Sequence, residues 1–272
     1  MKRTRLVLVA LLALVLPGLG QPAEARSKQP GSDIIGGEEA EPGEFPFMVA
    51  ILDDGIDGSD LDKQFCGGSL IAAQWVLTAG HCFLGFEEVA VVVGRTDLTN
   101  DNQGLRFENV DVFVNDDLDS FFNDVALIRL PSPVNTDLFP PIALTPVGDD
   151  HLEQSGVRLT TIGWGTTTAR GKPVYPDILQ KVVVPVVGDG PCQDVYKKKL
   201  DASTMVCAGE AGLDSCVGDS GGPLFGIENG VPIQVGITSW GQGCAKKRFP
   251  GVYTEVNSPE IRDWIDETTA EN

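Results

Sequence analysis

The chain has 272 residues, of which 42% are apolar, so it can bury the core of one large domain or of two smaller ones. Its formal net charge is −19, and the first 33 residues hold five basic and two acidic side chains, which leaves 15 basic against 37 acidic side chains in the rest. A surface this acidic repels nucleic acids and anionic membranes, and we therefore exclude both as partners.

Residues 1–25 have the pattern of a secretory signal peptide. They begin with three basic side chains, continue with the apolar run LVLVALLALVLPGLG and end with the motif AEA, which predicts cleavage after Ala25. The polar residues 26–33, RSKQPGSD, are predicted to be a pro-segment. No later apolar run is long enough to span a membrane, so we expect the mature protein to be secreted and extracellular.

From residue 34 onward, short apolar or alternating runs are separated by turn residues. Examples are FMVAIL, VAVVVG, DVALIRL, RLTTIGWG, KVVVPVV, IQVGITSW and GVYTEV. Many short strands with little helix between them predict an all-β sandwich or barrel. The last segment differs, because Ser258 and Pro259 suit the start of a helix and three apolar residues after them share one helical face, so a C-terminal helix is predicted there.

Six cysteines follow the predicted signal peptide, namely Cys66, Cys82, Cys192, Cys207, Cys216 and Cys244. An even number of cysteines in an exported chain predicts three disulfides, for which 15 pairings are possible. The chain contains no C-x-x-C pair and only two histidines, which argues against a zinc site.

The segment GDSGG, residues 218–222, surrounds Ser220 with glycines. Glycine is costly to order, so such a segment indicates either a presented nucleophile or a tight polar turn. The match to G-x-S-x-G does not indicate an α/β-hydrolase, because Gly222 and Pro223 disfavour a following helix and no histidine follows Ser220.

A nucleophilic serine needs a base, and the two histidines are the candidates. His151 lies in the polar loop GDDHLEQSG and is predicted to be solvated, whereas His81 lies beside Cys82, where a disulfide would anchor its ring. Asp124 directly precedes an apolar strand, so we expect it to be partly buried and to need a partner. The predicted order of the site along the chain is therefore His81, Asp124, Ser220.

Four motifs, TAGHC, NDVALIRL, GDSGGP and SWGQGC, occur in this order. Together they resemble the motifs of the trypsin-like branch of the chymotrypsin family of serine proteases, over the range from Ile34 to about residue 268. The resemblance implies two six-stranded antiparallel Greek-key β-barrels, over about residues 34–137 and 138–257, and a C-terminal α-helix over about residues 258–268. It also implies a secreted serine endopeptidase that is made as a zymogen, acts as a monomer on protein or peptide substrates, is open to protein inhibitors and needs no cofactor or metal.

The resemblance implies a catalytic role for each matching residue. Ser220 would attack the scissile carbonyl to form an acyl-enzyme, and His81 would take its proton and later give it to the leaving amine. Asp124 would hold the imidazole, while the backbone amides of Gly218 and Ser220 would form the oxyanion hole. Related binding proteins on the same fold usually lose one of these residues, and because this chain has them all, the resemblance favours an enzyme over a binding protein.

The resemblance also implies a substrate pocket and an activation site. Asp214 would lie at the pocket floor and favour Arg or Lys before the cut bond, and the other implied lining residues are Ser215, Ser239, Trp240, Gly241, Gly243 and Gly251. Asp219 would pair with the new N-terminus that cleavage before Ile34 creates. The implied disulfides are Cys66–Cys82, Cys192–Cys207 and Cys216–Cys244.

Two features depart from the family pattern. Arg95 and Arg106 occupy positions where related proteases place calcium ligands, so we expect no metal there and expect the acidic insert at residues 53–62 to be a solvated loop. Asp33 precedes Ile34, where trypsin precursors usually carry Lys or Arg, so we expect a separate activating protease.

Overall fold

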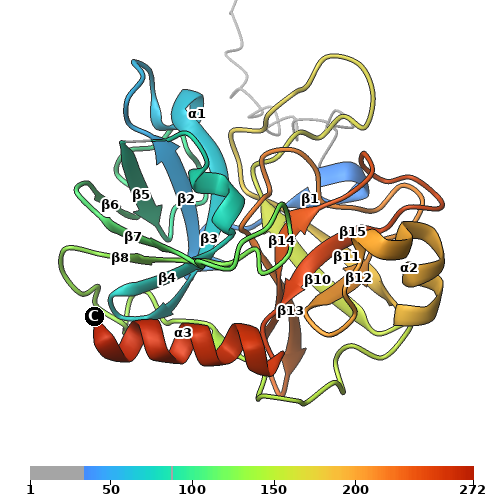
Figure 1. Ribbon diagram of the computed structural model, residues 1–272. Helices are drawn as coiled ribbons and strands as arrows, with labels where there is room; N and C mark the ends of the chain where they lie inside the picture. The colour runs from blue at the N-terminus through green and yellow to red at the C-terminus, as the bar shows by residue number, and fades with distance from the viewer. Residues whose placement is uncertain (1–33, 87) are drawn as a thin grey trace, which may run out of the picture. The chain divides into compact units, whose positions relative to one another are not determined.

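Two β-sheets make up most of the computed structural model, which describes residues 34–86 and 88–272 (Figure 1). The predicted signal peptide and pro-segment lie outside the described residues. Within the described residues, no helix is both long and apolar enough to cross a membrane.

The first sheet contains seven antiparallel strands in the order β6-β5-β2-β3-β4-β8-β7. Their bounds are β2 Met48–Asp53, β3 Gln64–Ala72, β4 Trp75–Thr78, β5 Val89–Val93, β6 Leu105–Phe107, β7 Asp111–Val114 and β8 Ala126–Arg129. The first five residues of β2, MVAIL, are all buried, which explains why this strand is a continuous apolar run rather than an alternating one.

The second sheet contains a closed ring of six strands. The ring runs β11-β10-β13-β14-β15-β12, and an antiparallel pairing of β11 with β12 closes it. The bounds are β10 Arg158–Gly163, β11 Gln180–Val187, β12 Met205–Ala208, β13 Pro223–Glu228, β14 Val231–Trp240 and β15 Gly251–Glu255. In β11 every second residue is buried, as a strand with one face toward a barrel core requires.

Two short strands join the second sheet at its margin. Strand β1 (Glu38–Glu39) pairs with β11, and β9 (Ala143–Leu144) pairs in parallel with β14. Residues 38–39, which the resemblance assigns to the N-terminal barrel, thus pair with a strand of the second sheet.

The all-β fold class is confirmed, although the strand counts differ from two barrels of six. Only the second sheet is closed by strand pairing, since the first sheet ends at β6 and β7, for which no mutual pairing is found among the described residues. This difference follows from a property that residue patterns do not encode, namely which edges of a curled sheet come close enough to exchange hydrogen bonds.

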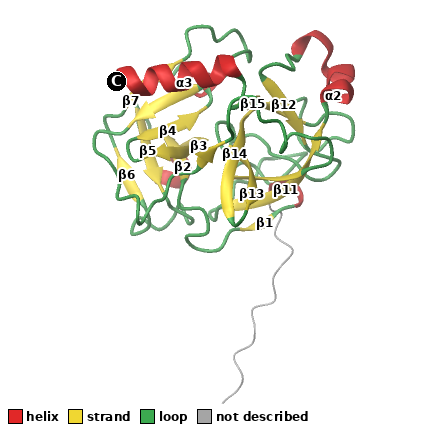
Figure 2. Cartoon of the chain, turned by 90° about the horizontal axis from the view of Figure 1, so that it is seen from below, coloured by secondary structure: helices red, strands yellow, loops and turns green. Residues whose placement is uncertain are grey.

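Helices contribute little, as predicted. The described α-helices are α1 (Asp60–Lys63), α2 (Asp189–Tyr196) and α3 (Pro259–Glu271), with 3₁₀ turns η1 (Ile34–Gly36), η2 (Gly80–Phe83) and η3 (Lys197–Lys199). The helix α3 follows the last strand of the second sheet but lies alongside the first sheet (Figures 1 and 2). Ile261 and Ile265 on α3 are buried in the core cluster that contains the strands of the first sheet.

Three disulfides cross-link the described chain, between the pairs that the resemblance implies. Cys66–Cys82 links β3 to η2, Cys192–Cys207 links α2 to β12, and Cys216–Cys244 links two loops of the second sheet. No described cysteine is free.

Candidate active site

The candidate base and its carboxylate come from neighbouring segments of the first sheet. His81 lies in η2 directly after β4, and Asp124 lies just before β8, which pairs with β4. The His81 Nδ1 atom is 2.7 Å from Asp124 Oδ2, and the backbone N–H of His81 donates to Asp124 Oδ1 at 2.8 Å. Two contacts to one carboxylate fix both the position and the rotation of the imidazole, as an orienting acid must do.

Asp124 is fully buried, and residues of the second sheet complete its surroundings. Ser239 on β14 donates its hydroxyl proton to Asp124 Oδ2, and Thr254 on β15 donates to the Asp124 carbonyl at 2.9 Å. The carboxylate is therefore held by hydrogen-bond donors from both sheets. The sequence predicted Ser239 only as a pocket residue, because nothing in a local motif relates it to a carboxylate 115 residues earlier.

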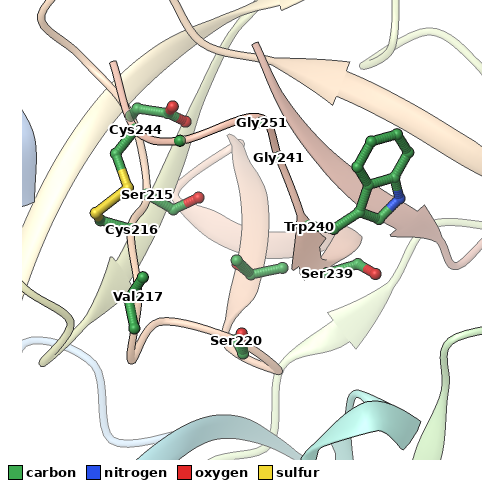
Figure 3. Close-up of a pocket in the computed structure, with 12 residues that line it drawn as sticks. Ser215, Cys216, Val217, Ser220, Ser239, Trp240, Gly241, Cys244 and Gly251 are labelled. Atoms are coloured by element: carbon green, nitrogen blue, oxygen red, sulfur yellow. A yellow bond between two sulfur atoms is a disulfide. The ribbon is translucent and has the colours of Figure 1, made fainter. Parts of the chain in front are cut away.

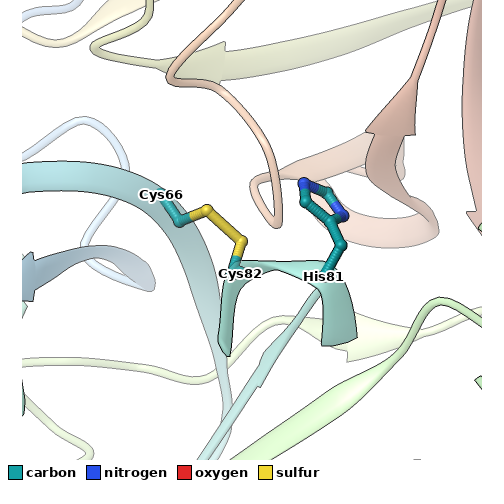
Figure 4. A group of neighbouring side chains, drawn as sticks. All are labelled: Cys66, His81 and Cys82. Atoms are coloured by element: carbon teal, nitrogen blue, oxygen red, sulfur yellow. A yellow bond between two sulfur atoms is a disulfide. The ribbon is translucent and has the colours of Figure 1, made fainter. Parts of the chain in front are cut away.

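The Cys66–Cys82 disulfide anchors the turn that carries His81 (Figure 4). His81 and these two cysteines are close enough to resemble a metal-binding group. The sulfur atoms are bonded to each other, however, and a metal requires free thiolates, so this group cannot hold zinc. His81 Nε2 makes no hydrogen bond to a described residue, which leaves it available to exchange a proton with a hydroxyl.

Ser220 lies where the two sheets meet. Its carbonyl accepts a hydrogen bond from the backbone N–H of Gly67 on β3 at 2.7 Å. The next residue, Gly221, has φ +80° and approaches the first sheet so closely that an added Cβ would lie 2.2 Å from Thr78 Oγ1. Thr78 ends β4, directly before the turn that carries His81, so the glycine after Ser220 allows nucleophile and base to come from different sheets.

The backbone around Ser220 leaves two amides without partners. Gly218 has φ +100°, a conformation that favours glycine, and Gln64 donates a side-chain hydrogen bond to its carbonyl at 3.0 Å. Neither the Gly218 N–H nor the Ser220 N–H donates to a described residue. Two free donors beside a serine hydroxyl are the arrangement that an oxyanion hole requires.

A cavity of about 170 Å³ opens beside Ser220 (Figure 3). All seven predicted pocket residues line it, together with Ser220 and the two cysteines of the implied Cys216–Cys244 disulfide. The sequence missed only Val217 and Thr238. In Figure 3 the Cys216–Cys244 disulfide and Trp240 lie on opposite sides of the cavity, with Ser220 at its lower edge.

Asp214 places a buried carboxylate in the lining of this cavity. Only 2% of the residue is exposed, its Oδ2 accepts the Ala245 N–H at 2.8 Å, and its Oδ1 has no partner among the described residues. Burial raises the pKa of Asp214 to about 7. An added Cβ on Gly251 would lie 2.9 Å from Asp214 Oδ1, so the glycine leaves the carboxylate open to a ligand. A buried carboxylate oxygen of this kind would be stabilised by a cation.

Asp219 is fully buried and is not among the residues that line the cavity. Its two oxygens accept the backbone N–H groups of Gly165 at 2.7 Å and of Cys216 at 2.8 Å. Burial raises the pKa of Asp219 to about 6, and no described cation forms an ion pair with it. Ile35, next to the predicted cleavage point, contacts the other buried aspartate, because its carbonyl accepts the Asp214 N–H at 3.4 Å.

The acidic insert is only in part the solvated loop that the sequence predicted, because residues 55–59 are exposed whereas Asp54 and Asp60 are partly covered and form ion pairs. Arg95, which is 3% exposed, lies 2.6 Å from Asp60, and Arg106 lies 2.6 Å from Asp54. The insert also forms the short helix α1, capped by Ser59. The local sequence shows only the acids, because the two arginines that neutralise them, Arg95 after β5 and Arg106 in β6, come more than 30 residues later.

The other histidine lies in a different acidic group. His151 is exposed, with Nδ1 2.6 Å from Asp149 and Nε2 in contact with Glu228. Nearby, Glu153 and Glu255 form a carboxylate group with Asp150. Burial raises the pKa of Glu153 to about 9, so this carboxyl keeps its proton near neutral pH.

Comparison with known proteins agrees with this geometry. The family model described as Trypsin matches residues 34–265 of the chain. Trypsin-1 from Astacus astacus is 38% identical over 243 residues, and this match covers 85% of the chain and 98% of that relative.

Proposed function

The chain belongs to the trypsin family of serine proteases, and on this premise we propose that it is a secreted endopeptidase that cuts after Arg or Lys and is made as a zymogen. Membership of the family makes it a serine endopeptidase that hydrolyses peptide bonds in protein substrates. The observation that carries the finer proposal is Asp214, a buried carboxylate at the cavity beside Ser220 with one oxygen left unpaired.

We assign the chemistry to His81, Asp124 and Ser220. Ser220 Oγ bonds to the substrate carbonyl carbon while His81 Nε2 takes the hydroxyl proton. His81 then protonates the amine as the C–N bond breaks, and water attacks the resulting acyl-enzyme by the reverse sequence. Asp124, held by four donors, stabilises the imidazolium that forms in each step.

The amides of Gly218 and Ser220 receive the negative charge of the tetrahedral intermediate. Their lack of other acceptors supports this role, since a preorganised donor needs no rearrangement when the charge develops. Removal of one such donor typically costs on the order of 10²–10³ in turnover.

Activation follows from the second buried aspartate. We propose that residues 1–25 are removed on secretion and that residues 26–33 are cut off before Ile34, which leaves residues 34–272 as the peptidase domain. The new ammonium group would then pair with Asp219, which has two amide donors but no described cationic partner. Pairing stabilises a buried carboxylate, so cleavage would favour the ordered Ser220 loop.

The selectivity proposal is tested with the activated enzyme and peptides that differ only at the residue before the cut bond. We expect efficient cleavage after Arg and Lys and little after Leu or Phe. Asp214→Ser should lower kcat/KM for the Arg peptide by about a thousandfold or more, because a buried guanidinium would lack its counter-charge. Asp263→Ser, the same change on an exposed face of α3, is the matched control. Equal cleavage after Leu and Arg by the wild-type enzyme would refute the selectivity.

A further inference from the structure

Basic side chains without a partner are distributed unevenly over this acidic molecule. Of the 15 lysines and arginines in the described residues, eight form ion pairs within 4.0 Å. The other seven form none among the described residues, and they are Arg170, Lys172, Lys198, Lys199, Lys246, Lys247 and Arg248. All seven are exposed.

These seven cations occur in three segments, and two of the segments contact residues that line the substrate cavity. Lys246 contacts Gly243, a cavity-lining residue, because an added Cβ on Gly243 would lie 2.8 Å from the Lys246 Cε. The loop of Arg170 and Lys172 begins at Thr166, whose N–H donates to the carbonyl of cavity-lining Val217 at 2.8 Å. The third segment is the 3₁₀ turn η3, which contains Lys198 and Lys199.

Lys198 and Lys199 line a second cavity, of about 660 Å³, next to the first. The two cavities share Trp240 and Gly241 as lining residues. Aromatic rings form much of its wall, and the centroids of the Tyr196 and Phe121 rings lie 4.7 Å and 6.0 Å from that of Trp240. This second cavity therefore offers an apolar surface with two unpaired ammonium groups at its margin.

The next step rests on the proposed function. The resemblance implies that Trp240 belongs to the segment that pairs with substrate backbone. If Arg or Lys of the substrate enters the Asp214 cavity, the residues before it therefore leave that cavity past Trp240 and the adjacent Gly241. These are the residues that both cavities share, so the side chains two and three positions before the cut residue reach the second cavity. Lys198 and Lys199 would then be the unpaired charges nearest to these two substrate side chains.

We propose that this protease selects substrates that carry Asp or Glu two or three residues before the Arg or Lys at which it cuts, with Lys198 and Lys199 as specificity-determining residues. Charge complementarity supports this choice of occupant. The rest of the chain is strongly acidic and repels acidic peptides, whereas the margin of the cavity presents cations that no described carboxylate neutralises. Unpaired charges of one sign beside a cleft also raise the rate at which oppositely charged substrates associate.

The experiment measures kcat/KM on three peptides with the same Arg at the cut site and Glu-Glu, Gln-Gln or Lys-Lys at the two positions named above. We expect the Glu-Glu peptide to exceed the Gln-Gln peptide by about three- to tenfold at low salt, as exposed ion pairs allow, and the Lys-Lys peptide to be poorest. Because exposed charges are screened, the Glu-Glu advantage should shrink toward unity at about 0.5 M NaCl.

Variants of the lysine run identify the residues responsible. Lys198→Gln with Lys199→Gln should abolish the preference for Glu-Glu, and Lys198→Glu with Lys199→Glu should reverse it. Lys197→Glu is the matched control, because Lys197 is adjacent in sequence but lies 3.5 Å from Asp194 and does not line the cavity. It should retain the wild-type preference.

Wild-type kcat/KM values that are equal for the Glu-Glu and Gln-Gln peptides at low salt would overturn the inference, whether or not the variants fold. A loss of preference in Lys197→Glu as large as in the double variants would overturn the role of Lys198 and Lys199. A failure to cut any of the three peptides after Arg would instead refute the proposed function, so the two failures are distinguishable.

Discussion

Three aspartates, Asp124, Asp214 and Asp219, are each at most 2% exposed, yet their surroundings differ. Asp124 contacts an imidazole and a serine hydroxyl, and Asp219 accepts two backbone amides. Asp214 accepts one amide and keeps one oxygen unpaired. A buried carboxylate is costly without donors. The number of donors supports the proposed roles, in which Asp124 orients the base, Asp219 gains a cation on activation and Asp214 gains one from the substrate.

Ser220 and His81 act as one catalytic unit in the proposed mechanism. Ser220→Ala and His81→Ala should each lower kcat for an Arg amide by about 10⁶, and the double variant should be hardly slower than either, because the residues act together. Hydrolysis is measured after the N-terminus of each activated variant has been verified. Losses that multiply in the double variant would contradict the assignment.

The affinity of the Asp214 cavity for a cationic ligand should depend on pH. Asp214 has a pKa raised to about 7 in the empty cavity, and a guanidinium ligand binds only its ionised form strongly. The affinity of such a ligand should therefore fall by up to about tenfold for each pH unit below about 7 and be constant above it. Calorimetric titration of the activated Ser220→Ala variant between about pH 5 and pH 8 measures this. Asp214→Asn should bind weakly with no such slope, and an equal slope in that variant would assign the titration to another group.

Among the strands and helices, the sequence predicted best those that have a local pattern of apolar residues. The strands and the C-terminal helix were visible as apolar periodicity, and α3 was predicted over residues 258–268 against the observed Pro259–Glu271. Strands β1 and β9 are two residues long and carry no period, so only their partners in the second sheet define them. The helices α1 and α2 were missed for a similar reason, because one lies in an acidic run and the other contains a Gly-Pro pair.

The network between α1 and the loop after β5 gives a prediction about stability. Removing the buried guanidinium with Arg95→Met should leave Asp60 without its 2.6 Å partner and destabilise the fold by about 2–3 kcal/mol. For a domain of this size, that corresponds to a thermal midpoint lower by about 5–10 °C. Arg170→Met, which removes an arginine that forms no ion pair among the described residues, should leave the midpoint within about 1 °C.

Chelation tests whether the acids of the insert bind a metal ion in addition to the arginines. The arginines already neutralise the acids of the insert, so EDTA should change neither the activity nor the thermal midpoint of the wild-type protein by much. A midpoint that falls by more than about 5 °C, roughly 2 kcal/mol, would show a metal site that the sequence did not predict.

At the scale of the whole molecule, the candidate site exists only where the two sheets meet. His81 and Asp124 come from the first sheet, whereas Ser220 and the Asp214 cavity come from the second. The sequence named all these residues because each stands in a recognisable local motif. It could not predict the hydrogen bonds from Gly67 to Ser220 and from Ser239 to Asp124, or the position of Lys198 beside Trp240, because such contacts depend on how distant segments pack.

The proposed activation of the precursor depends on this same arrangement. In the proposed function, the pocket that selects the residue before the cut contains Asp214, and the bond to be cut follows Asp33. Two carboxylates would meet in a desolvated cavity, which disfavours binding, so the enzyme should not cut its own precursor before Ile34. It could cut after Arg26 or Lys28, but the resulting amine would lie five or more residues before Ile34, too early in the chain to replace the Ile34 amine at Asp219.

We therefore predict that the wild-type precursor needs a separate activating protease and that Asp33→Arg makes activation autocatalytic, because an Arg before Ile34 matches the enzyme's own pocket. Purified precursors of both forms are incubated alone, and their N-termini are sequenced over time. Asp33→Arg should produce an Ile34 terminus at an accelerating rate as active enzyme accumulates, and its Ser220→Ala version should produce none. If the wild-type precursor alone generates Ile34 termini, and its Ser220→Ala version does not, then the pocket accepts an aspartate and the argument from charge repulsion fails.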